Sequence, residues 1–404
     1  MNACGLIVEY NPFHNGHVYN IDEARKASGA DCMIAVMSGS FLQRGEPAII
    51  DKFHRTKAAL RTGIDIVLEL PYLFAVQNSD IFAEGAVKTL HEAGVSTICF
   101  GSESGSISHF ITSFHTYKAK HTIFEQTMQR YLASGVSFPE ASKHAYREIG
   151  LTEEKMDLSK PNNILGYSYV KSIMENNLPI IPLTVKRTSN QYHDKTITGS
   201  IASATSIRKE LLETDALAPH IIATMPEETA QQLKLYKDTA ADWHNWEQYF
   251  PLLQYRVLTM TPDELTAIKG VDEGLEHRII KTAATAATFN DWVGAIKTKR
   301  YTWTRIQRIF VHILTNTKKA DYGTDLHQSV PYVRVLGMTQ TGRDYLHKQK
   351  KQMNVPLISK MTRNQNPVLA MEEKASRAYY SVLSSKKRQQ LFKQELRAPI
   401  MVQK

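Results

Sequence analysis

The sequence predicts an α/β fold in which a Rossmann-like, parallel-sheet domain is followed by a mainly helical, basic domain. Two observations carry this prediction. Up to about residue 214, short apolar runs alternate with amphipathic runs, as in sheets whose strands are joined by helices. Beyond about residue 215 the strand signals fade and helical periodicity dominates. We therefore expect one domain over residues 1–214 and a second over residues 215–404.

The first strand–turn–helix unit sets up the predicted site. Ala3–Val8 is an apolar run that predicts a strand, and His17–Ala27 has apolar residues spaced for one helix face. The turn between them reads Asn11-Pro12-Phe13-His14-Asn15-Gly16-His17. Ligands of open α/β sheets bind at the carboxyl ends of strands, and a helix start suits a phosphate. Gly16 lets the backbone approach such a ligand, beside His14 and His17.

The elements that follow continue the alternation. Strands are predicted at Cys32–Met37, Ile64–Leu70, Ser96–Phe100 and Ile180–Val185, and helices at Ile50–Arg61, at Ser79–Glu92 and from Asn162, as N-cap, to about Glu175. A loop after the second strand carries Gln43, Arg44 and Gly45 at its tip. Residues 107–150 are helical and more polar, which predicts an insertion packed beside the sheet. Ser203 opens the last helix of this domain.

Three further residues are predicted at the same crevice. Gly101 follows the carboxyl end of a strand, where the backbone must pass close to a ligand. Asn162 stands at a helix start and could bind a ribose or a base, and Arg187 leaves a strand on the ligand side and could neutralise a phosphate. Each has an ordinary alternative, respectively a turn glycine, a helix cap and a solvated arginine.

Two patterns resemble the signatures of the adenylyl-transferring nucleotidyltransferase superfamily. The His-x-Gly-His pattern at residues 14–17 resembles the first signature, whose two histidines contact the ATP phosphates and stabilise the transition state at the α-phosphorus. Ser203, Thr205 and Arg208 resemble the second signature. There, small hydroxyls and helix-start amides hold the β and γ phosphates, and an arginine assists. A surface turn with two solvated histidines is the alternative for the first pattern.

Five stretches together are similar to the bacterial tRNA(Met) cytidine acetate ligase family. These stretches are residues 11–17, Phe100-Gly101-Ser102-Glu103, Lys160-Pro161-Asn162-Asn163-Ile164-Leu165-Gly166, Tyr192-His193-Asp194 and Ser203-Ala204-Thr205-Ser206-Ile207-Arg208. The likeness covers essentially the whole length, including the basic tail. Members of this family use ATP and acetate to make acetyl-adenylate. They transfer the acetyl group to the wobble cytidine of elongator methionine tRNA, giving N4-acetylcytidine.

The resemblances imply an ATP site in which His14 and His17 are catalytic. The ATP-binding residues that they imply are Ile7, Val8, Glu9, Tyr10, Asn11, Pro12, Phe13, His14, Asn15, Gly16, His17, Val18, Tyr19, Asn20, Gly101, Asn162, Arg187, Ser203, Thr205 and Arg208. Acetate would attack the α-phosphorus and pyrophosphate would leave, so no protein nucleophile is required. Mg²⁺ would arrive with ATP, because no compact carboxylate cluster marks a protein-held metal site.

Charge is distributed unevenly along the chain. Residues 291–404 contain 22 Lys and Arg against 7 Asp and Glu, whereas residues 1–290 contain 27 against 33. A basic second half predicts a polyanionic partner, and basic residues with interleaved aromatics fit RNA contacts. The basic groups are centred on Arg305, Arg308, Lys348 and Lys386. A solvated basic face is the alternative for these groups, and helix core is the alternative for Trp303 and Phe310.

Two other classes of protein share part of these features. A small-molecule adenylyltransferase, of the pantetheine or nicotinate type, would leave the basic half unexplained. A non-catalytic RNA-binding protein would leave both phosphate signatures unused. The sequence contains no apolar run long enough to span a membrane and no secretory leader, and its three cysteines lack metal-ligand spacing. These features predict a cytoplasmic protein, and no feature indicates an oligomeric state.

Overall fold

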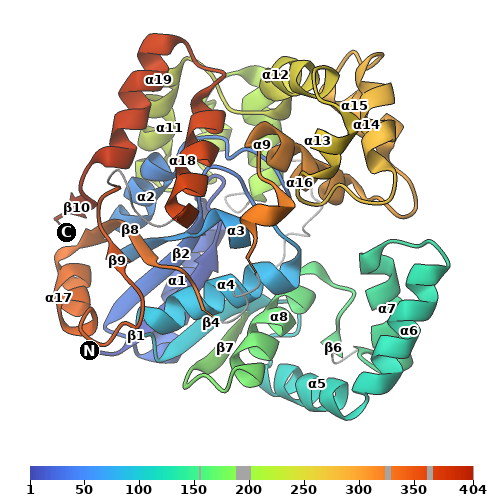
Figure 1. The fold of residues 1–404 in the computed structure, drawn as a ribbon. Helices are drawn as coiled ribbons and strands as arrows, with labels where there is room; N and C mark the ends of the chain where they lie inside the picture. The colour runs from blue at the N-terminus through green and yellow to red at the C-terminus, as the bar shows by residue number, and fades with distance from the viewer. Residues whose placement is uncertain (154–155, 188–201, 324–328, 362–366, 404) are drawn as a thin grey trace.

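One large sheet forms the centre of the molecule and has helices on both faces (Figure 1). The computed structural model describes residues 1–153, 156–187, 202–323, 329–361 and 367–403. The strands in spatial order are β10 (Ile400–Val402), β8 (Val333–Thr339), β3 (Ile66–Leu70), β2 (Cys32–Ser38), β1 (Ala3–Val8), β4 (Thr97–Ser102) and β7 (Ile181–Lys186), and β9 (Leu357–Ile358) pairs with β8. The predicted α/β class is confirmed.

The helices of the first part alternate with these strands. They are α1 (Asn15–Ser28), α2 (Lys52–Arg61), α3 (Tyr72–Ala75), α4 (Ser79–Glu92), α8 (Pro161–Glu175) and α9 (Ala204–Thr214). All strand pairs from β3 across to β7 are parallel. The predicted strand at Ala3–Val8 and the predicted helix at Ser79–Glu92 have the bounds that the sequence indicated.

Side-chain alternation along β2 explains how the sheet is covered on both faces. Ile34 and Val36 belong to the core that the sheet shares with α4 and α8. Met33 and Ala35 point to the opposite face and join the core shared with α1 and α2. Successive strand residues face opposite sides, so an unbroken apolar run fits a strand that is buried on both faces.

The strand order reverses at β1. The chain continues from β1 to β2 and β3 on one side, and then returns to place β4 and β7 on the other side. In open α/β sheets, ligands bind at such a reversal, beyond the carboxyl ends of the strands. The fold therefore puts the turn at residues 9–14 at the expected ligand site.

The segment at residues 107–150, predicted as a helical insertion, forms three helices that project at the lower right of Figure 1. They are α5 (Ile107–Ala119), α6 (His121–Ala133) and α7 (Phe138–Glu148). A short antiparallel pair, β5 (Thr152–Glu153) and β6 (Met156–Asp157), follows them and leads into α8.

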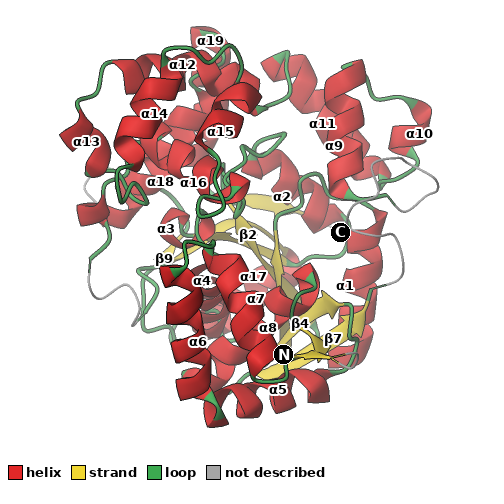
Figure 2. Cartoon of the chain, turned by 90° about the vertical axis from the view of Figure 1, so that its right-hand side faces the viewer, coloured by secondary structure: helices red, strands yellow, loops and turns green. Residues whose placement is uncertain are grey.

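A mainly helical region follows α9, and Figure 2 shows most of it in the upper half of the view. It contains α10 (Pro219–Ile222), α11 (Glu227–Ala240), α12 (Trp246–Leu258), α13 (Pro262–Thr266), α14 (Leu275–Ala283), α15 (Phe289–Ile296), α16 (Trp303–Leu314) and the 3-10 helix η1 (Lys319–Asp321). Aromatic residues form its core: Trp246 stacks on Phe289 at 4.5 Å, and Trp292 lies 4.6 Å from Phe310. Phe310 is therefore a core residue.

The end of the chain returns to the sheet. β8 pairs antiparallel with β3, and β10 pairs with β8. The helices α17 (Gln340–Gln349), α18 (Pro367–Tyr380), α19 (Ser385–Phe392) and η3 (Lys393–Leu396) connect or follow these strands. This return to the sheet was not predicted from the sequence. The division of the chain at about residue 214 stays a prediction.

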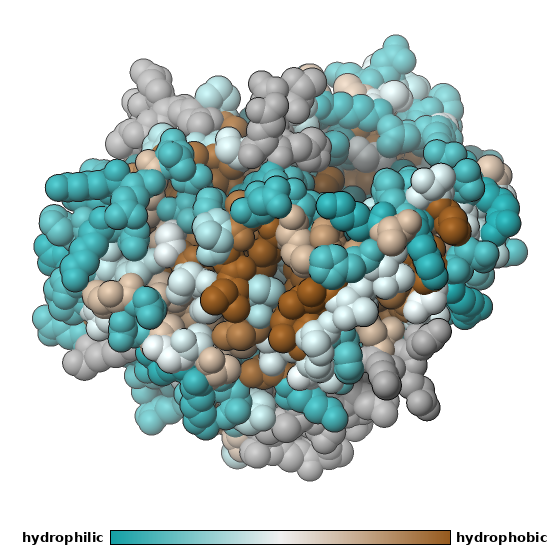
Figure 3. Space-filling model, turned by 90° about the horizontal axis from the view of Figure 1, so that it is seen from below, coloured by the Kyte–Doolittle hydropathy of each residue, from teal (hydrophilic) through white to brown (hydrophobic). Residues whose placement is uncertain are grey.

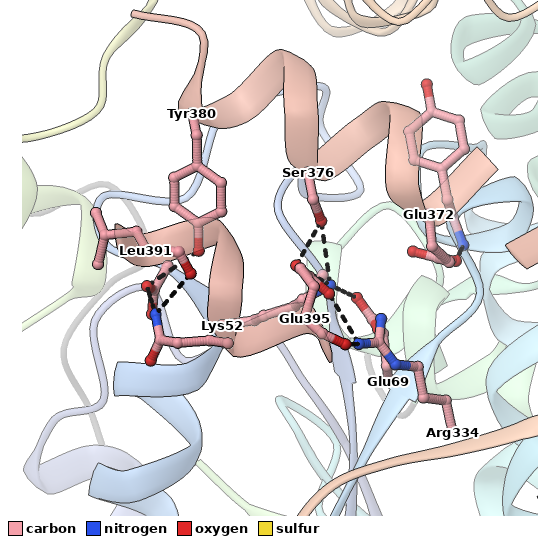
Figure 4. A network of polar contacts seen from close by, with 12 residues as sticks. Lys52, Glu69, Arg334, Glu372, Ser376, Tyr380, Leu391 and Glu395 are labelled. Atoms are coloured by element: carbon pink, nitrogen blue, oxygen red, sulfur yellow. Dashed lines mark hydrogen bonds and ion pairs between the residues drawn. The ribbon is translucent and has the colours of Figure 1, made fainter. Parts of the chain in front are cut away.

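A buried cluster of charged side chains fixes this return (Figure 4). The Lys52 ammonium lies 2.6 Å from the Glu69 carboxylate and 2.9 Å from that of Glu395. Arg334, on β8, reaches the same two carboxylates at 2.6 and 2.8 Å. All four side chains are at least 96% buried. The cluster therefore joins α2 and β3 to two segments near the end of the chain.

Glu372 lies beside this cluster and should make stability depend on pH. Burial and the neighbouring Glu69 carboxylate raise the pKa of Glu372 from 4.5 to about 8. Between these values the folded protein holds a proton that the unfolded chain releases. The free energy of unfolding should therefore fall as pH rises through this interval.

The substitution Glu372→Gln tests this effect. A glutamine oxygen can still accept the hydrogen bonds that the Tyr72 N–H and the Tyr332 hydroxyl donate to the carboxyl group. The variant should be more stable than the wild type near pH 8 and differ little near pH 5, in urea unfolding followed across pH. The same pH dependence in both proteins would show that Glu372 is not the titrating group.

The surface in Figure 3 is mostly hydrophilic, with apolar residues gathered near the centre of the view. Within the described ranges, no helix is both long and apolar enough to cross a bilayer. Cys4, Cys32 and Cys99 are buried thiols outside any disulfide, as expected for core residues.

Candidate active site

A cavity of about 560 Å³ opens at the carboxyl ends of β1 and β4, where the strand order reverses. Its volume is within the range of small-molecule sites, and its position is the one expected for this fold. The walls come from the ends of β1, β4 and β7, the starts of α1, α4, α8 and α9, and the loop after β2. Its apolar wall includes Phe82, Phe100, Ile164 and Tyr169.

Two histidines stand at the start of α1 in the wall of this cavity. His14 is the N-cap of the helix, and its Nδ1 accepts a hydrogen bond from the Gly16 N–H at 3.1 Å. Nδ1 of His17 accepts a hydrogen bond from the His14 N–H, also at 3.1 Å. The ring centroids lie 3.8 Å apart. This capping box therefore holds both imidazoles side by side at the positive end of the helix dipole.

The electrostatic environment keeps both rings neutral. Burial lowers the pKa of His14 to about 3, and the Arg187 and Arg208 guanidiniums add to this effect. Burial, His14 and Arg187 hold the pKa of His17 well below 6.5. Because Nδ1 of each neutral ring accepts a hydrogen bond, Nε2 carries the hydrogen. Each ring thus brings one N–H donor to the cavity wall.

The turn before α1 is held by distant parts of the chain. The Asn11 side-chain oxygen accepts a hydrogen bond from the Ile49 N–H at 2.8 Å, and the Asn11 carbonyl accepts one from Arg208 at 2.8 Å. Tyr10 has a φ of 49°, a value that residues other than glycine rarely adopt. The Asn11–Pro12 peptide bond is cis. The surrounding structure therefore determines the path of this turn.

Gly101 and Arg187 lie together in the wall of the cavity, where β4 and β7 end. A Cβ at Gly101 would come within 3.2 Å of Cγ of Arg187 and 3.6 Å of the Asn20 side-chain oxygen. The Arg187 side chain therefore crosses over Gly101. Because Gly101 has no side chain, it leaves room for that of Arg187. The sequence had instead predicted that the backbone at Gly101 passes close to a ligand.

The predicted N-cap role of Asn162 is wrong. Lys160 is the N-cap, α8 begins at Pro161, and Asn162 lies in its first turn. The Glu103 carboxylate caps the helix by accepting hydrogen bonds from the Asn162 and Asn163 N–H groups at 3.2 and 2.7 Å. It also accepts one from the Asn162 side chain at 2.7 Å. Asn162 still lines the cavity.

The second predicted signature reaches the cavity from α9. The helix starts at this stretch as predicted, and the Ser203 hydroxyl caps it by accepting a hydrogen bond from the Ser206 N–H at 3.1 Å. Thr205 is exposed at the cavity wall. Arg208 donates to the Asn11 carbonyl and pairs with Glu46 at 3.2 Å. It therefore links α9 to the turn and to the loop after β2.

The structure brings together most of the predicted ATP-site residues. Those that line the cavity are Ile7, Val8, Glu9, Tyr10, Asn11, His14, Gly16, His17, Tyr19, Asn20, Gly101, Asn162, Arg187, Ser203, Thr205 and Arg208. Those outside its lining are Pro12, Phe13, Asn15 and Val18. Phe13 is a buried core residue. The motif Tyr192-His193-Asp194 lies outside the described residues.

Sequence reasoning missed the wall formed by the loop after β2. Gln43, Arg44 and Glu46 line the cavity from this loop. The loop is braced by the helical part, since the Trp246 indole donates to the Gly45 carbonyl at 2.9 Å and Arg308 donates to that of Gln43 at 3.4 Å. Its position after the carboxyl end of a central strand was the signal that could have identified it.

The predicted basic groups lie in different places. Arg308 is largely buried, donates to backbone carbonyls, and has its pKa lowered to about 10 by burial and by the nearby Arg305 and Arg44. It is therefore a brace for the loop. The helix α17 lies beside the N-terminus in Figure 1 and packs near Ala93, so it is at the end of the sheet opposite the cavity. Lys348 is an exposed residue of this helix. Lys386 is exposed on α19.

Comparison with known proteins places the chain among nucleotidyl transferases. A family model described as HIGH Nucleotidyl Transferase matches residues 1–395. A protein of Oceanobacillus iheyensis named tRNA(Met) cytidine acetate ligase is 56% identical over 402 residues, covering 100% of both chains. A Bacillus subtilis protein with the same name is 45% identical and covers 94% of this chain and 92% of its own length.

A solved structure agrees with these relatives. The crystal structure of Thermotoga maritima TmcAL bound with alpha-thio ATP matches with a TM-score of 0.90 at 31% sequence identity. The match covers 100% of each chain. An apo form of the same protein matches with a TM-score of 0.91.

Proposed function

The chain belongs to the tRNA(Met) cytidine acetate ligase family, and from that premise we propose how its cavity carries out the reaction. ATP activates acetate as acetyl-adenylate, and the acetyl group then passes to the wobble cytidine of elongator tRNA(Met), giving N4-acetylcytidine. The observation that carries this proposal is the pair of neutral imidazole donors at the start of α1, beside Arg187, in the cavity at the strand reversal.

The first step needs charge stabilisation more than it needs a nucleophile from the protein. An acetate oxygen attacks the α-phosphorus, and the bond from the α-phosphorus to the bridging oxygen of pyrophosphate breaks. Negative charge develops on the phosphoryl oxygens, where Nε2–H donors of His14 and His17 and the Arg187 cation would stabilise it. The donors are already oriented by the capping box, so little reorganisation is required.

We propose that Mg²⁺ arrives with ATP as part of the substrate. Of the carboxylates, only Glu9 and Glu46 are among the cavity-lining residues that the structure describes. Over the same described residues, no group of three or more His, Cys, Asp or Glu side chains could hold a metal ion. The Mg²⁺ ion would therefore be held mainly by the phosphates of ATP.

The second step requires tRNA to reach the same cavity. Lys186, Arg187 and Arg44 are exposed residues of the cavity wall, and Arg305 and Arg44 both lie within electrostatic range of Arg308. We propose that these cations around the mouth hold backbone phosphates of the anticodon loop. The exposed cations of α17 lie at the opposite end of the sheet and are not part of this surface.

Substitution of Arg305 tests the position of the tRNA. Arg305→Ala should weaken tRNA binding and flatten the salt dependence of its Kd by about 0.7 in slope, as expected for one lost phosphate contact of a single-stranded loop. Acetate-dependent ATP–pyrophosphate exchange should not change. Lys348→Ala is the matched control and should leave tRNA binding as it is. Equal effects of the two substitutions would contradict this placement.

A panel of carboxylic acids tests the proposed first step. ATP–pyrophosphate exchange should depend on acetate and should be weak with longer acids and with nicotinate or phosphopantetheine. Exchange that depends on one of the latter two compounds would favour a small-molecule adenylyltransferase. Absence of exchange with every acid, together with tRNA binding, would favour a non-catalytic RNA-binding protein.

A further inference from the structure

The proposed second step releases a proton that some group must accept, and the inference below rests on that proposed function. The cytidine N4 amine attacks the acetyl carbonyl and becomes an amide, so it loses one proton. An amine on a cytosine ring is a weak nucleophile, and removal of this proton as the bond forms would increase the rate. The acceptor must be one of the groups that line the cavity, which differ in their ability to take up a proton.

The two histidines are unsuited to accept the proton. Nδ1 of each ring already accepts a backbone hydrogen bond, and Nε2 already carries hydrogen. A further proton would make an imidazolium in a buried place beside the cations Arg187 and Arg208. The histidines are therefore donors in both steps, and the base must come from elsewhere.

Two carboxylates remain in the described wall of the cavity, and their surroundings differ. Glu46 forms an ion pair with Arg208 at 3.2 Å, so its charge is already compensated. Oε1 of Glu9 accepts a hydrogen bond from the Gln43 N–H at 2.9 Å. Oε2 of Glu9 has no hydrogen-bond partner in the described part of the chain, although the residue lines the cavity. Glu9 thus has an oxygen available to a substrate.

The backbone around Glu9 is held firmly. Glu9 follows the last residue of β1, and its carbonyl accepts a hydrogen bond from the buried Arg55 guanidinium at 2.7 Å. Arg55 also donates to the Ser38 carbonyl at 3.0 Å, at the end of β2. The carboxylate is therefore fixed at the carboxyl ends of the two central strands, a few residues before His14 in the chain. A base held in this way needs no reorganisation during the reaction.

We propose that Glu9 is the general base for acetyl transfer and that Oε2 accepts the hydrogen bond of the cytidine N4 amino group. Carboxylates are the side chains that accept hydrogen bonds from the amino group of cytosine. The same contact would orient the amine toward the acetyl carbonyl and would favour cytosine, because uracil has an oxygen at that position.

The step balances in atoms and electrons. The N4 lone pair forms a bond to the acetyl carbonyl carbon, and the bond from that carbon to the phosphate oxygen of AMP breaks with its electron pair. The N4 proton passes to Oε2 of Glu9 and then to solvent or to the departing AMP. The products are the N4-acetyl amide and AMP, and no oxidant, reductant or metal is consumed.

The charged groups around Glu9 come from several elements. Burial and the Glu46 carboxylate raise the pKa of Glu9 above 4.5, while the Gln43 N–H, Arg208 and Arg44 lower it. Arg55 and the Tyr169 phenol also lie within electrostatic range of Glu9. A raised pKa brings the carboxylate closer to the working pH, which suits a general base. Transfer should therefore increase with pH as Glu9 loses its proton.

The test compares Glu9→Gln with Glu9→Asp and with Glu23→Gln, which makes the same chemical change on α1 at a partly exposed residue that pairs with Lys26. Two activities are measured on each protein: acetate-dependent ATP–pyrophosphate exchange, and single-turnover acetyl transfer to unmodified tRNA(Met) across pH. Glu9→Gln keeps an oxygen for the Gln43 N–H, so any loss of exchange should be much smaller than the loss of transfer. Transfer should fall by about a hundredfold or more, with little change in tRNA Kd.

The pH profile separates a base from a structural group. Wild-type transfer should show a limb that rises with pH, Glu9→Gln should lack it, and Glu9→Asp should keep it at a lower rate. Two results would overturn the role of Glu9 but not the proposed function. One is a wild-type rate of transfer in Glu9→Gln. The other is an equal loss of exchange and transfer in a Glu9→Gln protein with normal thermal unfolding. A wild-type protein that exchanges pyrophosphate but never acetylates tRNA would overturn the proposed function as well.

Discussion

Substitution of His17 by alanine should reduce acetate-dependent ATP–pyrophosphate exchange by about a hundredfold or more, as is found when one preorganised donor to developing charge is removed. The reason is the geometry at the start of α1. Nε2–H of His17 is oriented by the hydrogen bond that its Nδ1 accepts from the His14 backbone. Water that fills the vacated space would not be fixed in this way.

His14 needs a more careful substitution, because it also caps the helix. His14→Ala removes both the donor and the cap, and a lost cap costs about 1 kcal/mol of stability. His14→Asn keeps a good N-cap residue but places no N–H group where Nε2 was. Its exchange rate should also fall about a hundredfold, with near-normal thermal unfolding. The control is His220→Asn, at an exposed residue of α10. Near-normal exchange in His17→Ala and His14→Asn would contradict the phosphate role.

Substitution of Lys52 by methionine should destabilise the fold by about 3–5 kcal/mol, because it leaves buried carboxylates without their cation. Lys52 is 1% exposed and contacts both Glu69 and Glu395. Without it, Arg334 alone faces both carboxylates. Methionine fills much of the same volume, so the loss reports mainly the uncompensated charge.

Urea unfolding of Lys52→Met measures this loss. Lys234→Met is the matched control, because its exposed ammonium pairs with Asp238 on the surface of α11 and should matter little. If the two variants were equally stable, the buried cluster would not be what fixes the end of the chain to the sheet. Limited proteolysis should also cleave Lys52→Met near its carboxyl terminus before the rest of the chain.

The sequence predicted the parts of this protein that are determined locally. The strand at Ala3–Val8, the helix at Ser79–Glu92 and the start of the helix at Ser203 were found because periodicity and helix-start residues act over a few neighbours. The histidine turn was found for the same reason. These elements suffice to place a ligand site at the carboxyl end of the first strand.

Long-range contacts determine what the sequence could not predict. β8 enters the sheet through antiparallel pairing with β3. Its Arg334 pairs with Glu69, more than two hundred residues earlier in the chain, and with Glu395, about sixty residues later. The start of α8 is capped by Glu103 from another loop, so Asn162 was given the wrong role. The loop after β2 lines the cavity because Arg308 of helix α16 holds it in place through the Gln43 carbonyl.

The fate of the acetyl group tests the proposed reaction most directly. The protein is incubated with ATP, isotopically labelled acetate and unmodified elongator tRNA(Met), and the tRNA is digested to nucleosides. We expect label in N4-acetylcytidine at the wobble position, with one AMP and one pyrophosphate released for each acetyl group transferred. Label in a protein or a small molecule, or release of ADP and phosphate in place of AMP and pyrophosphate, would contradict the proposed reaction.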